Sequence, residues 1–558
     1  MAGGDTLIIG PGSYRMGQGA PGSEECSSDY PWDCHMPPVP SGPDAEHPTR
    51  ILGAGGGAAR PELWGAERAF TILNLEGSTN VEIGGLELTD HLGCVEFHTG
   101  GIPCPREEYP YGDWCPRGIY AVDSRRVYIH DLDIHGLAYA GIQAGRLADW
   151  RVENVRLAGN GWAGWDGDVE GEDANSGEMR FLGLVVEWNG CGEAYPGGHP
   201  TGCWAQTAGG YGDGLGTGET GGEWIFEDSV FRNNTSDGLD LLYAVRTGAT
   251  ITIRRTWAGG NAGNQIKTAG PARIENCIVA GNCGFFEGKG FTYFVDSCRA
   301  LGNALSLSLR PGDEALIVNC TITGEGDCLI LAECLGPSCD GTERVTLRNN
   351  ILLGQVDYLQ PLEKTCLTYG GGFPGDPFDR DYSVIWGVKE EPCPAAAHDC
   401  CEDPRLAGMT LEAFDAMLMA DSPAIDAGLA ACGLTMDYAG NPRPSGALPD
   451  IGAYEYPSGW DAGCTAIGGG WRRLGWFGDY VPMGDWIFHN KHGFWYPAPG
   501  STPQNIWFYT QDMGWLYTSN PLYSFLYRSS PAAWLWYNEA TNPRWFWNMT
   551  TGTWESRP

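Results

Sequence analysis

The chain has 558 residues, which is long enough for a large core and for more than one domain. Its formal net charge of −36 argues against nucleic acid as a partner, because phosphate binding requires a basic surface. The 84 glycines and 37 prolines, without long apolar runs of helical period, indicate an all-β protein rich in turns.

The chain has twenty cysteines, which is more than an ordinary cytosolic enzyme contains. Their even number suits disulfides, and we therefore expect an oxidising compartment. No apolar segment has membrane-spanning length, and the chain opens without a hydrophobic leader. We therefore expect an extracellular or cell-surface protein whose signal peptide has been removed or left out of the numbering.

The first segments indicate strands interrupted by loops. Residues 4–15 combine an apolar strand, a Pro-Gly turn and a second strand, and residues 70–90 alternate apolar and polar side chains as half-buried strands do. The insertion between them contains Cys26 and Cys34, which could pair. From residue 118 onward the strands become regular.

Two polar clusters follow in the next segments. His130 and His135 flank two aspartates, and we interpret them as solvent-facing ladder residues because no third metal ligand is evident nearby. The acidic loop of residues 162–178 could bind a calcium ion or could be a solvated loop, and we favour the solvated loop. Its acidic residues are Asp166, Asp168, Glu170, Glu172 and Asp173.

Asparagines that close short apolar runs reveal a repeat. They are Asn160, Asn189, Asn233, Asn261, Asn282 and Asn303, and the last three intervals are 28, 21 and 21 residues. A period in the twenties with Gly/Asn turns is typical of a solenoid of stacked parallel strands. We therefore predict a right-handed parallel β-helix over residues 1–458.

The repeat aligns two aspartates with one of the five lysines in the chain. Asp240 follows its asparagine by seven residues and Lys267 follows its own by six, so the two side chains should share one face. Asp213 lies 24 residues before Asp237 and can belong to the coil below. Three such carboxylates suit a hard cation, and a lysine can act as a base where arginine cannot.

Simpler interpretations of these residues remain open. Asp-Gly pairs are common in turns, so Asp237 and Asp240 could serve the turn alone. Lys267 could form a structural ion pair with Asp240.

A secreted β-helix that places DG-x-D one coil before N-x-x-K resembles family nine of the polysaccharide lyases, the calcium-dependent pectate lyases. The resemblance implies that Asp213, Asp237 and Asp240 bind Ca²⁺ and that Lys267 abstracts a sugar proton. The family usually has a further aspartate directly before DG-x-D, and this chain has Ser236 there. The resemblance covers the central third of the chain at the level of motifs.

The charge distribution favours an anionic glycan as the partner. Residues 153–240 contain sixteen acids and three bases, whereas residues 241–310 contain eight bases and three acids. Most of the arginines in the second segment should lie along the edges of the coils, but Arg246 or Arg310 could bind a substrate carboxylate. The insertion of residues 191–214, tied by Cys191 and Cys203, should present Trp204 and Tyr211 to a sugar ring.

Later cysteines and the end of the predicted solenoid give further expectations. Cys277, Cys298 and Cys320 recur at intervals of 21 and 22 residues, as one buried column would. The pairs Cys320 with Cys328 and Cys334 with Cys339 are two possible disulfides. Residues 421–428 and 437–456 resemble the closing segment of secreted β-helices and should cover the open end, with a short helix at residues 411–420.

Residues 459–558 form a different module. It holds twelve of the 23 tryptophans and repeats an aromatic strand, a polar turn and an aromatic strand, which predicts β-hairpin repeats. The aromatic side chains suit sugar rings or the cell envelope, but in so small a domain they could form its core, which we favour.

Three functions are compatible with this sequence. We favour a secreted calcium-dependent lyase acting on an acidic polysaccharide. A non-catalytic glycan-binding or structural surface protein is the second. An inverting glycoside hydrolase, using Asp237 and Asp240 as its two carboxylates, is the third, although motifs of the polygalacturonase kind are absent.

Overall fold

The computed structural model describes the chain except for residues 18–35, 55–58, 67–68, 96–113, 170–174, 197, 205–210, 295–297, 337–338, 356–365, 389–392, 458, 463, 500, 504 and 558. It divides into two compact units, Met1–Glu455 and Tyr456–Pro558. The prediction places this boundary after residue 458.

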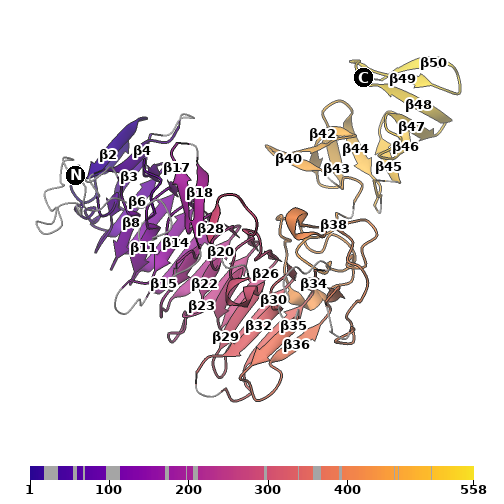
Figure 1. Ribbon diagram of the computed structural model, residues 1–558. Helices are drawn as coiled ribbons and strands as arrows, with labels where there is room; N and C mark the ends of the chain where they lie inside the picture. Colours follow the sequence, from indigo (N-terminus) through magenta and orange to yellow (C-terminus); the bar gives the residue numbers. More distant parts are fainter. Residues whose placement is uncertain are drawn as a thin grey trace, which may run out of the picture. The chain divides into compact units, whose positions relative to one another are not determined.

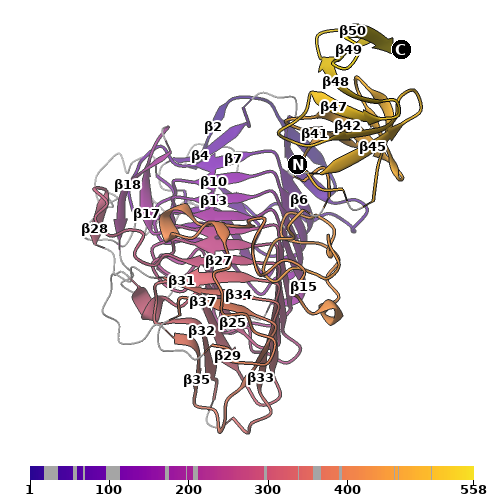
Figure 2. The same cartoon turned by 90° about the vertical axis from the view of Figure 1, so that its right-hand side faces the viewer.

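The first unit is a parallel β-helix, as predicted, in which successive strands join three sheets in turn (Figure 1). Sheet 1 contains β1 Thr6–Ile9, β3 Thr49–Gly53, β6 Thr79–Gly84, β9 Arg125–His130, β12 Ala148–Glu153, β15 Ser176–Leu182, β20 Glu223–Glu227, β23 Thr250–Arg254, β26 Ala272–Glu275, β30 Glu314–Val318, β33 Arg344–Arg348 and β36 Phe378–Asp381. Sheet 2, whose strands lie one above another in Figure 2, contains β2 Ser13–Gly17, β4 Glu62–Ala66, β7 Glu87–Thr89, β10 Asp133–His135, β13 Arg156–Ala158, β16 Val185–Glu187, β21 Val230–Arg232, β24 Trp257–Gly259, β27 Ile278–Gly281, β31 Thr321–Gly324, β34 Ile351–Gly354 and β37 Val384–Trp386. Sheet 3 contains β5 Leu73–Asn74, β8 Arg117–Val122, β11 Ala140–Gly145, β14 Ala163–Gly167, β19 Leu215–Thr217, β22 Leu239–Leu241, β25 Ile266–Ala269, β29 Leu305–Leu309, β32 Cys328–Cys334 and β35 Cys366–Gly371.

The core lies between the three sheets and consists of side chains stacked coil upon coil. Val152, Phe181, Phe226 and Ile253 occupy one register on four successive strands of sheet 1. The Phe181 and Phe226 rings stack with centroids 4.5 Å apart. Inward side chains therefore repeat at the strand spacing, and every outward row is free to carry polar groups.

Asparagine has two roles in this unit. At the corner between sheets 1 and 2, residues such as Asn276 (φ 50°) and Asn319 (φ 53°) adopt left-handed backbone, which asparagine tolerates better than other residues with a side chain. Buried asparagines also form a ladder inside the coils. Asn160 donates to Asn189, Asn189 to Asn234, and Asn234 to Asn261, at 3.0, 2.9 and 2.8 Å.

This ladder corrects the predicted alignment at two positions. The ladder residue of the third coil is Asn234, because its neighbour Asn233 occupies a left-handed corner (φ 56°). Asn303 bonds to Asn264 on the preceding coil instead of to Asn282. The sequence could not separate two adjacent asparagines with different roles.

The described cysteines follow the predictions in part. Disulfides Cys191–Cys203 and Cys334–Cys339 confirm two predicted pairs. Cys328 pairs with Cys366 and not with Cys320 as predicted. Cys298 pairs with Cys283 and is therefore not part of the predicted column. Cys277 and Cys320 are free and buried. Cys393–Cys401 is a further disulfide, and Cys26 and Cys34 lie outside the described residues.

Short elements lie outside the three sheets. They are the loop strands β17 Cys191–Ala194, β18 His199–Trp204 and β28 Thr292–Phe294, the hairpin β38 Leu406–Gly408 and β39 Asp415–Leu418, and the 3₁₀ turns Arg299–Gly302, Leu411–Ala413 and Ala430–Cys432. The helix predicted at residues 411–420 is wrong. Only one 3₁₀ turn forms there, and Ala416 and Leu418 are buried in an alternating strand instead.

The segment after this hairpin runs along the side of the coils. Asn276 donates to the carbonyl of Met436, Asn319 to that of Asp450, and Asn349 to that of Leu429. The corner asparagines of successive coils therefore anchor the segment that we expected at the open end. Among the described residues, no helix has the length and apolarity needed to cross a membrane.

The second unit is a single antiparallel sheet in which each strand pairs with the next. Its strands are β40 Thr465–Gly468, β41 Trp471–Leu474, β42 Gly478–Met483, β43 Trp486–His489, β44 Gly493–Pro497, β45 Ile506–Thr510, β46 Gly514–Thr518, β47 Phe525–Ser529, β48 Ala532–Asn538, β49 Arg544–Asn548 and β50 Thr553–Arg557. One face carries the core, which includes Trp495, Phe508, Leu516 and Phe546.

Candidate functional site

The candidate site lies on the outward face of sheet 3. Strand β22 lies between β19 and β25, and the register places Asp240 beside Gly216 on one side and beside Lys267 on the other. The predicted alignment of Asp240 with Lys267 on one face is therefore confirmed.

Lys267 bridges two of the predicted aspartates. Its Nζ lies 2.5 Å from Oδ2 of Asp240 and 3.1 Å from Oδ2 of Asp237. Burial lowers the pKa of Lys267, but the charges of Asp237, Asp240 and Asp213 outweigh burial and raise the pKa above its ordinary value. The charges of the three aspartates therefore favour the ammonium form of Lys267 in this arrangement.

Asp213 completes a cluster of three carboxylates. Its Oδ1 accepts the backbone N–H of Asp237 at 3.0 Å, and one oxygen from each of the three aspartates lies within 4.8 Å of the others. Burial, followed by the charges of Asp237 and Asp240, raises the pKa of Asp213 to about 8. Burial also raises the pKa of Asp240, although Lys267 opposes this shift.

The interior ladder holds Asp237 in place. Asn303 donates to the side chain of Asn264, and Asn264 donates from its backbone and its side chain to Oδ1 of Asp237, at 2.6 and 3.0 Å. Two donors therefore engage one oxygen and leave the other facing Lys267. Asn264 was not singled out from the sequence, although its place in the N-x-x-K motif is a signal that could have found it.

Ser236 stands where the resembled family usually has a further aspartate. Its Oγ accepts a hydrogen bond of 2.8 Å from the guanidinium of Arg299. Arg299 follows Cys298, whose disulfide with Cys283 closes the loop that carries it. The residue before DG-x-D is therefore a neutral hydroxyl bound to an arginine. Arg299 was not among the predicted site residues because nothing in its local sequence marks it.

The acidic loop contributes to the same face. Asp166 pairs in register with Gly216 and accepts hydrogen bonds from Tyr139 and Gln143, at 3.0 and 2.8 Å. Desolvation and the charges of Asp166 and Asp240 raise the pKa of Asp168 to about 6. These two acids therefore extend the site along the sheet, while Glu170, Glu172 and Asp173 lie outside the described residues.

Two predicted sugar-facing side chains are not available to a ligand. Trp204 and Tyr211 are 1% and 0% exposed and pack together with Val95. This prediction is wrong because the insertion folds onto the coils and uses its aromatic residues as its own core. The disulfide Cys191–Cys203 joins the two strands of that insertion.

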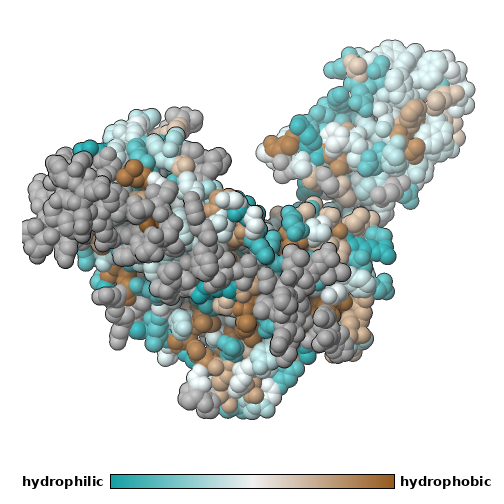
Figure 3. Space-filling view, viewed as in Figure 1, coloured by the Kyte–Doolittle hydropathy of each residue, from teal (hydrophilic) through white to brown (hydrophobic). Residues whose placement is uncertain are grey.

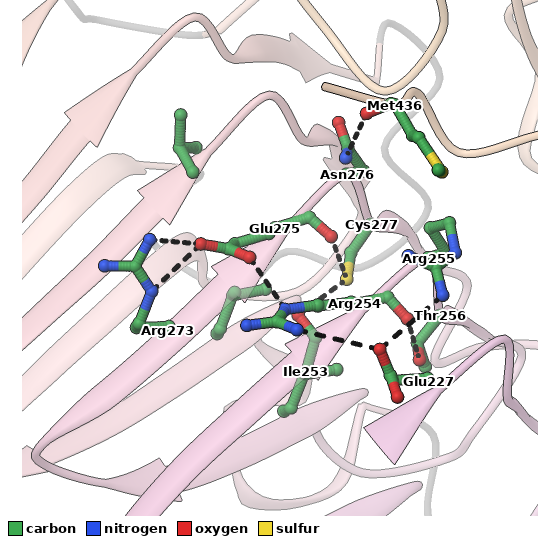
Figure 4. Close-up of polar contacts among 12 residues, drawn as sticks. Glu227, Ile253, Arg254, Arg255, Thr256, Arg273, Glu275, Asn276, Cys277 and Met436 are labelled. Carbon is green, nitrogen blue, oxygen red and sulfur yellow. Dashed lines mark hydrogen bonds and ion pairs between the residues drawn. The ribbon is translucent and has the colours of Figure 1, made fainter. Parts of the chain in front are cut away.

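Most arginines of the basic segment edge the coils, as predicted. Arg254 and Arg273 both bind Glu275, and Arg254 also approaches Glu227, on the outward face of sheet 1 (Figure 4). Within this segment, Arg299 reaches Ser236 of the site.

The two arginines predicted to bind a substrate carboxylate have structural partners. Arg246 lies 3.6 Å from Glu219. Arg310 binds Asp313 at 3.2 Å and donates to the carbonyl of Val245.

The histidines expected to face solvent are mostly enclosed. His135 bonds to Glu193 at 2.7 Å and to Glu87 at 3.1 Å, with 12% of its side chain exposed. Burial opposes protonation, but the two glutamates prevail and raise the pKa of His135 to about 10. His130 bonds to Asp131 at 2.8 Å. Both histidines are therefore engaged by carboxylates.

The three-carboxylate cluster fits a divalent hard cation. Three carboxylates face one ammonium group, so the cluster carries an excess of two negative charges when all are ionised. Their oxygen atoms are the donors that Ca²⁺ prefers. Gly216 leaves room beside Asp240, since a Cβ there would lie 3.1 Å from Oδ2 of Asp213.

Comparison with known proteins gives structural likeness only. No family model matches the chain, and no curated protein matches it. Among solved structures, pectate lyase Pel9A is 14% identical, with a TM-score of 0.38, over 81% of this chain and 98% of its own. The A-module of the Azotobacter vinelandii mannuronan C-5 epimerase AlgE6 is 12% identical, with a TM-score of 0.27, over 68% of this chain and 91% of its own.

A third solved structure, the PL6 family alginate lyase AlyGC, is 12% identical, with a TM-score of 0.25, over 71% of this chain and 50% of its own. Identities at this level leave the chemistry of the site to be argued from its own residues.

Proposed function

We propose that this protein is an extracellular, calcium-dependent polysaccharide lyase that cleaves a uronate-containing glycan by β-elimination. One observation carries the proposal: Nζ of Lys267 lies within 3.1 Å of two carboxylates in a buried group of three. A lone lysine next to a set of hard-cation ligands suits proton abstraction beside a carboxylate. The disulfides support an oxidising, extracellular location.

The proposed reaction assigns a role to each residue of the cluster. Asp213, Asp237 and Asp240 would hold Ca²⁺, which when bound would neutralise the substrate carboxylate that opposes negative charge at C5. Nζ of Lys267 would take the C5 proton, and the C5–H electron pair would form the C4–C5 double bond. The C4–O glycosidic bond would break with its electron pair going to the departing oxygen, which takes a proton from solvent. Lys267 must be neutral to do this, whereas the charges of the three aspartates raise its pKa and favour the ammonium form.

Other cations near the site would bind further substrate carboxylates. Arg299 reaches the site through Ser236, whereas Arg246 and Arg310 would first have to leave Glu219 and Asp313. We therefore place Arg299 first among the arginines that would contact an acidic glycan.

The test is an elimination assay on a panel of polyuronates, with calcium and then with chelator, followed by the ultraviolet absorbance of the unsaturated product. We expect a calcium-dependent rise that Lys267→Ala lowers by about 10²–10⁴-fold, the usual contribution of a general base. Lys289→Ala is the matched control, since Lys289 lies over the ring of Phe285 at 4.0 Å.

The ion pair of Lys267 favours a second candidate, a non-catalytic glycan-binding or structural protein. In that case Lys267 neutralises Asp237 and Asp240 and has no chemical role. Folded, calcium-bound protein that releases no unsaturated product from any polyuronate would exclude the lyase and favour this second function.

A further inference from the structure

The outward face of the second unit is covered by aromatic rings. Along β48 every second residue is exposed, and Trp534 and Trp536 are each 37% exposed while Leu535 between them is fully buried. The same alternation in β45 places Phe508 inside and Tyr509 outside. The sequence analysis favoured a core role for these rings, but the structure gives that role to one face only.

Exposed and half-buried rings form rows that run across the strands. One row joins Trp507, Tyr517, Tyr527 and Trp534, which are direct cross-strand neighbours on β45 to β48. A second row joins Phe525, Trp536, Trp547 and Trp554 on β47 to β50. Neighbouring rings are tilted or edge-on at about the strand spacing, with centroids 5.4 Å apart for Trp507 and Tyr517 and for Tyr527 and Trp534.

Nothing else in the unit covers these rows. All strands of residues 456–558 belong to one sheet, and within the described part of this range no helix or second layer packs on the outer face. An aromatic surface of this extent on a folded protein marks a binding site.

The choice of side chains indicates what binds. Leu and Ile residues of β45 to β48, such as Leu516, Leu526 and Leu535, all point inward, whereas most outward positions there carry rings. Flat rings at this spacing match the apolar faces of successive sugars in an extended chain, and Tyr and Trp also supply polar edges. The unit is mostly pale in Figure 3, since Trp and Tyr lie near the middle of the hydropathy scale.

The charges indicate a neutral ligand. Residues 456–558 contain six acidic and six basic residues, so the whole net charge of −36 belongs to the first unit. The five arginines are ion-paired within the unit, and Lys491 donates to the carbonyl of Glu539 at 3.1 Å. An acidic polymer would need cations that are not already engaged.

We propose that the outward aromatic face of β45 to β50 binds a neutral polysaccharide, whose chains lie along the rows of rings. This binding is separate from the proposed lyase reaction and differs from it in the charge of the glycan. It would hold the protein on an uncharged matrix while the first unit acts on an acidic component.

The test is affinity electrophoresis and pull-down of the full chain with cellulose, chitin, xylan and mannan, and with polygalacturonate and alginate for comparison. We expect binding to at least one neutral polysaccharide, weakened about tenfold or more by Trp534→Ala combined with Trp536→Ala. Trp534→Tyr combined with Trp536→Tyr should restore most of it. Trp386→Ala is the control, because Trp386 is also 37% exposed but lies on β37 of the first unit.

Three outcomes would overturn the proposal. They are the absence of binding to every neutral polysaccharide, equal binding by the alanine variant with an unchanged melting temperature, and binding that the Trp386 control loses as well. Concentration-dependent dimerisation or binding to lipid vesicles that the alanine variant abolishes would instead assign the face to a second copy or to a membrane.

Discussion

At the scale of single residues, the charge balance around Lys267 decides what the site can do. The ammonium group of Lys267 forms ion pairs with Asp237 and Asp240. Burial and the charges of these two aspartates raise the pKa of the neighbouring Asp213 to about 8. The cluster is therefore under-neutralised by the protein alone. A group of this kind is stabilised by any cation that enters it, and this gives a test that does not depend on catalysis.

Replacing Asp213 by Asn should remove this response to calcium. The Asn oxygen can still accept the N–H of Asp237, so the fold is preserved, but one charged ligand is lost. At calcium 100-fold above its Kd, the wild-type protein should gain about 2.7 kcal/mol against urea unfolding, and Asp213→Asn should gain much less.

Asp228→Asn is the control for this measurement, because Asp228 binds Arg255 at 2.6 Å at a corner of the coils. Equal calcium stabilisation of the Asp213 variant and the wild-type protein would show that the cluster is not the cation site.

At the scale of elements, the asparagine ladder links the interior of the coils to the site. Asn234 is fully buried, accepts from the backbone and side chain of Asn189, and donates to Asn261 and to the carbonyl of Val186. The related pair Asn303 and Asn264 ends on Asp237. The ladder therefore fixes the spacing and the corner geometry of the coils that carry Asp237 and Lys267.

Asn234→Ala should destabilise the first unit by about 3 kcal/mol, because it leaves donors and acceptors of two neighbouring coils unpaired in the core. Urea unfolding monitored by circular dichroism measures the loss.

The adjacent Asn233→Gly should be nearly neutral, since glycine adopts its left-handed backbone (φ 56°) without strain. Similar losses in the two variants would contradict the different roles of these neighbouring asparagines.

At the scale of the whole molecule, the two units differ in charge and in their core. The β-helix carries the acidic excess, and the second unit has its own aromatic core containing buried histidines. Nδ1 of His489 accepts the backbone N–H groups of Lys491 and His492, and its Nε2 bonds to the carbonyl of Phe477. Burial lowers the pKa of His489 to about 4 and that of His492 well below its ordinary value.

The second unit should therefore lose stability in mild acid. Between pH 6.5 and 4 the unfolded chain binds a proton at His489 that the folded unit does not bind, so stability falls as pH falls. The loss from His489 alone should be about 2 kcal/mol between pH 6.5 and 5. Tryptophan fluorescence during urea unfolding measures it, since twelve tryptophans lie in this unit.

His489→Gln should reduce this acid sensitivity, whereas His398→Gln should not, because His398 is exposed and bonds to Asp381. An unchanged pH response in the His489 variant would show that other groups control it.

The sequence by itself determined the repeat, the all-β class and the alignment of Asp240 with Lys267. These depend on local periodicity, and a parallel stack converts equal spacing along the chain into neighbours in space. The two confirmed disulfides and the change of composition before the aromatic unit are local in the same sense.

Only the tertiary structure decided the environment of each side chain. It buried Trp204 and Tyr211 in their own insertion, brought Arg299 to Ser236, and surrounded Lys267 with carboxylates that raise its pKa. It also divided the aromatic residues of the second unit between a core face and an exposed face. Burial and electrostatic neighbours arise from chain segments far apart in sequence, so no local pattern could state them in advance.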